Sequence, residues 1–133
     1  MVDSVIIREW IDKADEDFKF AEVNLKERGN FFAPICFHFH QASEKYLKAF
    51  IIAFELEFRK IHNLLHLIEI CKDKEPSFEN IREDCKTLNR FYIDTRYPVH
   101  WPTNYTMDEG QKAYDAASHI RNFVKMLLVN FLK

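Results

Sequence analysis

Apolar residues recur at alternating steps of three and four positions through most of the chain. This spacing is typical of amphipathic helices, which bury one stripe of side chains. Five segments carry it, at about 4–28, 32–57, 63–72, 77–94 and 106–131. The connections between most of these segments are short, which predicts antiparallel neighbours. We therefore expect an all-α, up-and-down bundle formed by one domain over residues 1–133.

Residues suited to helix ends lie at the predicted boundaries. The candidate N-caps are Ser4, Asn63, Ser77 and Thr106, and Thr106 forms a capping box with Glu109. Gly29 is expected to end the first helix. Pro98 and Pro102 fall in a stretch without helical period, so residues 96–105 are predicted to form a loop. Loops of this length in compact domains are often functional.

The second segment is apolar on two sides of the helical wheel. One stripe consists of Ile35, Phe39, Ala42, Tyr46, Ala49 and Ala53, and the other of Phe37, Leu47, Ile51 and Phe54. This pattern predicts a central helix that packs against its own bundle and against a second subunit. The same helix carries a polar strip, formed by Gln41, Glu44, Lys45 and Lys48. The strip predicts a phosphate-binding surface, or alternatively a solvated or salt-bridged helix face in which Glu44 and Lys48 pair across one turn.

Composition narrows the class of protein. Apolar residues make up 47% of the chain, which is enough for a hydrophobic core. The net charge of −2 excludes a basic nucleic-acid-binding coat, so any such site must be local. The chain has neither a long apolar run nor a basic leader, and we expect no membrane association. The odd number of widely spaced cysteines, Cys36, Cys71 and Cys85, predicts buried thiols in a reducing cytoplasm.

Several local sequences, taken in order, resemble the HEPN family, which is named for its occurrence in higher eukaryotes and prokaryotes and for nucleotide binding. The second segment contains Gln41-Ala42-Ser43-Glu44-Lys45-Tyr46-Leu47-Lys48-Ala49, which is similar to the family signature QAxEKxLKA. Ile61-His62-Asn63-Leu64 looks like its tHdL element, and Arg96-Tyr97-Pro98 looks like its RYP element. The resemblance implies four long helices plus one short helix and a homodimer. For a stand-alone prokaryotic member, it also implies pairing with a minimal nucleotidyltransferase as toxin and antitoxin.

Many members of this family are metal-independent ribonucleases that use an Arg and a following His in a cleft between two subunits. The corresponding residues here are Arg96 and His100, with one residue fewer between them than is usual. A His accepts a proton near neutral pH and an Arg holds a phosphate through two donors, as cleavage through the 2′-hydroxyl requires. The alternative is that Arg96 caps its helix or pairs with an acid and that His100 is a loop residue.

The resemblance and the charge pattern add further candidates. Some nucleotidyltransferase-paired members are modified on a tyrosine close after the Arg–His element. Tyr105 and Tyr97 are both candidates here, and their alternative role is to pack the loop onto the bundle. The candidates for holding nucleotide phosphates are Gln41, Lys45, Lys48, Arg96 and Tyr97. A basic face of Arg82, Lys86 and Arg90 could extend that lining or be an ordinary solvent face.

Metal and cofactor sites are not expected. His38 and His40 are two positions apart and diverge on a helix. His62 and His66 have the i,i+4 spacing of metal ligands, but His62 falls at a helix start, where we expect its ring to bond backbone atoms. Three functions therefore stand side by side. One is a nucleotide-binding interaction module with a nucleotidyltransferase partner, and another is a metal-independent endoribonuclease that uses Arg96 and His100. The third is a helical dimerisation module without a ligand.

Overall fold

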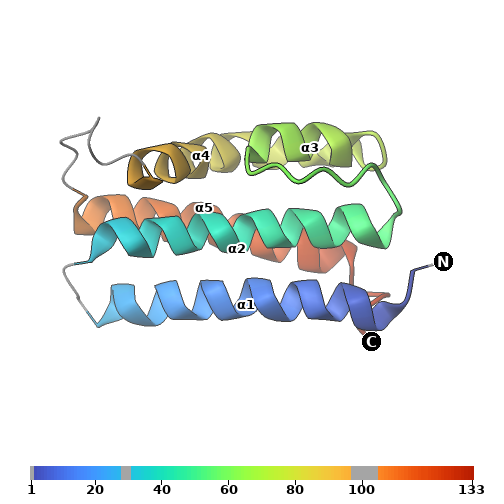
Figure 1. The fold of residues 1–133 in the computed structure, drawn as a ribbon, viewed down its shortest axis with the longest axis horizontal. Helices are drawn as coiled ribbons and strands as arrows, with labels where there is room; N and C mark the ends of the chain where they lie inside the picture. The colour runs from blue at the N-terminus through green and yellow to red at the C-terminus, as the bar shows by residue number, and fades with distance from the viewer. Residues whose placement is uncertain (1, 28–30, 97–104) are drawn as a thin grey trace.

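The computed structural model describes residues 2–27, 31–96 and 105–133, without the side chains of 93–96. Its elements are α1 (Ser4–Lys26), α2 (Phe32–Ala53), α3 (Leu64–Lys72), the 3₁₀ helix η1 (Pro76–Ile81), α4 (Arg82–Arg96) and α5 (Met107–Leu127). The fold is the predicted all-α, up-and-down bundle of four long helices and one short one, α3 (Figure 1). No helix in the described ranges combines the length and apolar character needed to cross a membrane.

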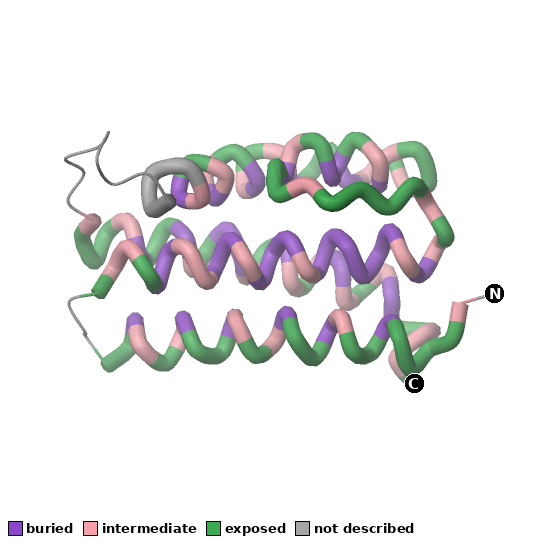
Figure 2. Tube along the Cα trace, viewed as in Figure 1, coloured by how far each residue is buried: buried purple, intermediate pink, exposed green. Residues whose placement is uncertain are grey.

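Helix α2 is the centre of the bundle, as its two apolar stripes predict. It packs against α1, α3, α4 and α5. Its buried residues extend along its whole length, whereas α1 buries one stripe (Figure 2). Leu47 and Ile51 of the second stripe are fully buried within this chain, and Phe37 and Phe54 are half-buried.

Aromatic side chains join the helices around α2. The Phe50 ring of α2 lies 4.6 Å from Phe78 of η1, and Phe78 lies 5.0 Å from Phe123 of α5. At the other end, Phe18 of α1 contacts Phe39 of α2 edge to face at 5.5 Å. Buried aromatic pairs of this geometry stabilise a core beyond the area that they bury. The three cysteines are free and buried, as predicted.

The helix boundaries agree with the sequence patterns except at two caps, one start and two ends. The fourth segment begins as the 3₁₀ helix η1 rather than as α4, and α5 ends at Leu127, although the pattern predicts a helix to 131. Asn63 caps α3 and Thr106 caps α5, as predicted. Ser4 is not a cap, because the carboxylate of Asp3 accepts from the Val5 amide and starts α1 one residue earlier. Ser77 is not a cap either: Glu75 accepts from both the amide and the hydroxyl of Ser77.

Helix α2 is shorter than the apolar pattern of its segment predicts. Helix α2 ends at Ala53, although the pattern predicts a helix to residue 57. Glu55 adopts a φ of 54°, a left-handed conformation that no α-helix continues. The chain then runs back along the bundle to Asn63, without helical structure, and brings residues 58–62 against the polar strip of α2. The expected stop at Gly29 lies outside the described residues.

Candidate functional site

An ion pair on α2 is buried in the middle of the polar strip. The Lys48 ammonium lies 2.8 Å from the Glu44 carboxylate, and the two residues are only 5% and 6% exposed. The predicted pairing across one helical turn is therefore confirmed, but the pair is not solvated. Lys48 lies over the ring of Phe58 at 5.8 Å, so the non-helical segment after α2 covers it.

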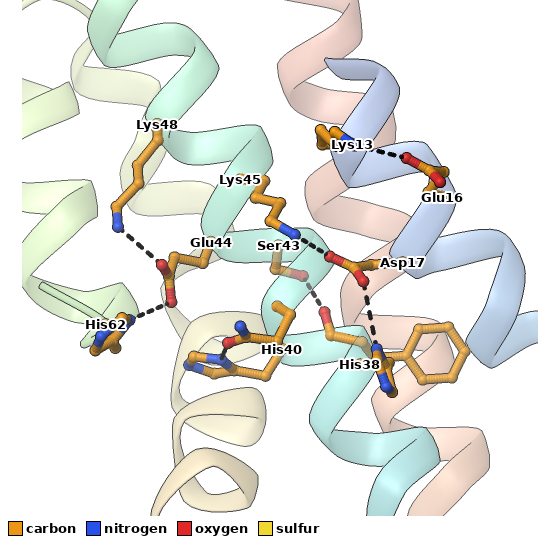
Figure 3. Close-up of polar contacts among 12 residues, drawn as sticks. Lys13, Glu16, Asp17, His38, His40, Ser43, Glu44, Lys45, Lys48 and His62 are labelled. Carbon is orange, nitrogen blue, oxygen red and sulfur yellow. Dashed lines mark hydrogen bonds and ion pairs between the residues drawn. The ribbon is translucent and has the colours of Figure 1, made fainter. Parts of the chain in front are cut away.

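His62 completes this pair from the segment before α3. Its Nδ1 lies 2.9 Å from Oε1 of Glu44, and its side chain is 47% exposed (Figure 3). The expectation that the His62 ring bonds backbone atoms is wrong for this nitrogen. The α3 cap is made by Asn63, whose side chain accepts from the amides of Leu65 and His66, and this leaves His62 to face α2. Glu44 thus has a buried partner and an accessible one.

Four rings from three segments gather beside Glu44. Tyr92 of α4 stacks on His62 at 5.1 Å and 23°, and on Phe37 of α2 at 6.1 Å and 22°. The ring of His40 lies 5.0 Å from Tyr92. Tyr92 is therefore the ring around which the other three are arranged, and the half-exposed His62 forms the outer side of the cluster.

His40 is fully buried in this cluster. Burial lowers its pKa, and the nearby Glu44 carboxylate opposes that shift. The imidazole is therefore neutral at neutral pH. Its Nδ1 lies 3.4 Å from Oε1 of Gln41, and its Nε2 has no hydrogen bond of ordinary geometry within the described part of the chain.

A cleft of about 310 Å³ opens on the exposed side of the rings. It is lined by Ile61, His62, Asn63, His66, Asn89 and Tyr92. The side-chain amides of Asn63 and Asn89 in this lining already make hydrogen bonds. Asn89 donates to Asn63 at 2.8 Å and accepts from the Leu64 backbone amide. These bonds join the start of α3 to α4 on one side of the cleft. Helix α4 ends at Arg96, one helical turn beyond Tyr92.

The structure divides the predicted phosphate strip between two sides of α2. Lys45 lies toward α1, where it donates to Asp17 at 2.5 Å, and Lys48 lies toward α3 (Figure 3). Gln41 lies beside His40 at the ring cluster. The Lys45 side chain is 30% exposed, whereas that of Lys48 is 7% exposed. Lys45 is thus the more accessible of the two lysines, and each already has a carboxylate partner.

The remaining predicted site residues are placed as follows. Tyr97 and His100 lie outside the described residues, as does the side chain of Arg96. Tyr105 is half-buried against the core, 5.7 Å from the Phe91 ring, with its hydroxyl oxygen buried. A modification of Tyr105 would therefore require its ring to leave this position.

The basic face of α4 is paired with acids along its length. Arg82 binds Glu79 and Glu69, Lys86 lies 3.3 Å from Glu83, and Arg90 lies 2.5 Å from Glu109 of α5. The Glu109 carboxylate, expected to complete the capping box, is used in this contact.

Sequence reasoning does not find the rings of the site. His40 is considered in the sequence only as a metal ligand, and His62 as a metal ligand or as a ring that bonds backbone atoms at a helix start. Tyr92 falls at a position of the helical period in its segment, which marks it as a packing residue and not as part of a site. The sequence features that could have indicated this site are the aromatic residues Phe37 and Tyr92 and the two histidines. These positions lie in three separate segments, however, and no sequence pattern shows that they meet.

The comparisons with known proteins agree with this architecture. The HEPN domain family matches residues 7–127, so the chain belongs to the HEPN family. Its fold is similar to the crystal structure of TT1696 from Thermus thermophilus, at 30% identity and a TM-score of 0.80, over 90% of this chain and 96% of that one. It is also similar to ST0689, an archaeal HEPN homologue, at 25% identity and a TM-score of 0.75, over 92% and 97% of the two chains. The search of curated proteins finds no match.

Proposed function

We propose that this HEPN domain is a nucleotide-binding interaction module that works with a minimal nucleotidyltransferase in a toxin–antitoxin-like pair. The observation that carries the proposal is the cleft beside the stacked His62 and Tyr92 rings. Aromatic faces bind nucleobases by stacking and tolerate any base, because every base has a π-face. The cleft is concave, apolar on one side and bordered by amides and histidines, as is usual for small-ligand sites.

For the phosphates of the nucleotide, the proposed binding residues are the candidates identified from the sequence. Arg96 follows Tyr92 by one turn of α4, and Tyr97 comes directly after it. Gln41 lies on α2 at the ring cluster, beside His40. Lys45 lies on the side of α2 that faces α1, so it would have to release Asp17 to reach a phosphate there. Lys48 does not contact the phosphates directly in this proposal. It binds the Glu44 carboxylate, which in turn contacts His62.

The experiment that tests this function is calorimetric titration of the intact chain with ATP, GTP and AMP. His62→Ala should weaken binding about tenfold, because a stacking contact contributes roughly 1–3 kcal/mol. His119→Ala is the matched control. His119 is also an exposed histidine with a carboxylate partner, Asp84 at 3.2 Å, but it does not line the cleft. Equal affinity of both variants would count against the cleft as the nucleotide site.

A homodimer and the nucleotidyltransferase partner belong to the same proposal. Exposed apolar side chains lie on α1 and on the segment after α2, among them Phe20 and Phe58. Such side chains suit contact with another protein. Sedimentation of the chain alone and mixed with the partner encoded beside it tests both, and a monomer that ignores this partner would contradict them.

The second candidate function is metal-independent RNA cleavage by Arg96 and His100. It is favoured by the position of Arg96, because the end of α4 follows the ring cluster that would hold a base. The assay is cleavage of tRNA and single-stranded RNA in EDTA, with Arg96→Ala and His100→Ala beside the wild type. Cleavage that both substitutions abolish without unfolding the protein supports this function, and cleavage that survives them refutes it.

A further inference from the structure

A second polar groove lies on another side of the bundle, between α1 and α5. Its volume is about 450 Å³, and its lining consists of Asp15, Phe18, Lys19, Glu22, Tyr114, Ser118, Arg121 and Asn122. A smaller pocket of about 210 Å³ shares Glu22 and Tyr114 with it and reaches Lys26 at the end of α1. None of these residues lines the ring cleft, so the two sites are separate.

The groove and the smaller pocket together are lined by two carboxylates, Asp15 and Glu22, and three cations, Lys19, Lys26 and Arg121. A fourth cation, Lys125, is not part of the lining but contacts Asp15. Asp15 accepts from Lys125 at 2.9 Å and from the Tyr46 hydroxyl, and the Nε of Arg121 lies 3.5 Å from the same carboxylate. Glu22 accepts from the Tyr114 hydroxyl at 3.1 Å and lies 3.8 Å and 3.6 Å from two lysines, Lys19 and Lys26. Two carboxylates thus face four cations, in a chain whose overall charge is −2. The local surplus favours an anionic ligand.

Two polar groups of the groove lack hydrogen-bond partners. Nε of Arg121 and Oγ of Ser118 are buried and make no hydrogen bond among the residues that the structure describes. A helical Ser or Thr commonly bonds the carbonyl four residues back, as Ser43 does to Phe39 at 2.9 Å and Thr87 does to Glu83 at 3.1 Å. The Ser118 hydroxyl makes no such bond to the carbonyl of residue 114. Ser118 lies one turn before Arg121 on the same face of α5, so the two unpartnered groups are neighbours.

Arg121 is held in place by an aromatic ring. Its guanidinium lies over Phe18 of α1, 5.2 Å from the ring centre. Stacking on a ring orients the planar guanidinium and leaves its in-plane N–H donors to bind other groups. Its hydrogen bond to the neighbouring Asn122 and its ion pair with Asp15 are both long, at 3.4 Å and 3.5 Å. An oxyanion can therefore replace weak contacts of this side chain rather than strong ones.

We infer that the groove between α1 and α5 binds a phosphate group, held by the Arg121 guanidinium and the Ser118 hydroxyl with Lys19 and Lys125 nearby. Arginine binds phosphate through two donors, and a serine hydroxyl adds a third. The inference does not rest on the proposed function of the ring cleft. The groove is larger than one phosphate requires, so a phosphate ester fits as well as the free ion.

Amide chemical-shift mapping of the intact chain tests this site, with pyrophosphate and AMP as separate probes. Both should shift the amides of Ser118, Arg121 and Asn122 to saturation. Arg121→Gln should weaken binding about tenfold and Ser118→Ala about fivefold, as losses of a charged and a neutral hydrogen bond. Lys112→Gln, on α5 but outside the groove, is the control and should bind as the wild type does.

The outcomes separate the sources of the phosphate and the two sites. Equal binding of both probes indicates a site for the phosphate group alone, and tighter binding of AMP indicates a nucleotide phosphate. Shifts confined to residues 61–66 and 92 would overturn this inference and leave the ring cleft intact. Unchanged affinity in Arg121→Gln would overturn it too, and if that variant does not fold, unchanged affinity in Ser118→Ala decides the same question.

Discussion

The buried Glu44–Lys48 pair makes a prediction that can be worked out quantitatively. The two groups are 8% and 7% exposed at their side chains, so removing one leaves the other charged in a place with little water. Breaking a buried pair in this way costs about 3–5 kcal/mol. Replacing both partners by apolar residues of similar volume is often close to neutral, because no charge then stays buried.

The two single substitutions are expected to differ. Lys48→Met leaves Glu44 with a second partner, His62 at 2.9 Å, so its cost should lie near the lower end, about 3 kcal/mol. Among the contacts of the described residues, Glu44→Leu leaves Lys48 only the Phe58 ring at 5.8 Å, and its cost should lie higher in the range. The double substitution should recover most of the loss, apart from the hydrogen bond of His62.

Urea unfolding followed by circular dichroism measures these changes. With a slope of about 2 kcal/mol per molar urea, a loss of about 3 kcal/mol lowers the midpoint by about 1.5 M. The matched control is Asp108→Leu with Lys112→Met on α5. That pair has the same i,i+4 spacing and a distance of 3.1 Å, but its side chains are 73% and 60% exposed. If the two pairs give equally small shifts, the burial of Glu44 and Lys48 plays no part in stability and the reasoning is refuted.

Three further predictions follow from single buried groups. Burial lowers the pKa of His40 below its ordinary 6.5, so at acid pH the unfolded chain binds a proton that the folded chain does not. The free energy of unfolding should therefore fall as the pH drops below about 6.5. The urea midpoint of His40→Gln should fall less over this pH range than the midpoints of the wild type and of the control His119→Gln. Burial raises the pKa of the Cys36 and Cys85 thiols to about 12, so a disulfide reagent at pH 8 should label them only as fast as the protein unfolds, and immediate labelling of folded protein would contradict their placement. Tyr46 donates to Asp15 from the centre of the bundle, so Tyr46→Phe should lower stability by about 1–2 kcal/mol in thermal unfolding, while an unchanged melting temperature would mean that this bond contributes nothing.

Local features of the fold are predictable from the sequence, since they depend on neighbouring residues. The helical period of α1 and α5 identifies their buried faces, and Asn63 and Thr106 are recognisable as caps because the groups that they bind lie two or three residues away. The errors are local as well. Asp3 and Glu75 cap their helices in place of Ser4 and Ser77. Each carboxylate comes one or two residues earlier and accepts from the amide two residues after it, that of Val5 for Asp3 and that of Ser77 for Glu75.

The sites depend on contacts that the sequence does not encode locally. The strip on α2 is predicted as one surface, but Asp17 draws Lys45 toward α1 and Glu44 holds Lys48 near α3. The pairing of His62 with Glu44 joins positions 18 residues apart, and that of Lys125 with Asp15 joins positions 110 apart. No periodicity reports such pairs, so the ring cleft and the groove between α1 and α5 emerge only in three dimensions.

The proposed nucleotide site is tested most directly by titrating the isotope-labelled chain with ATP and following its amide resonances. The account predicts saturable shifts at residues 61–66 and at Tyr92, and their loss in Tyr92→Leu, which removes the ring but keeps an apolar side chain at this half-buried position. Saturable binding that leaves those amides unmoved, or that is unchanged in Tyr92→Leu, would place the nucleotide elsewhere and contradict the account.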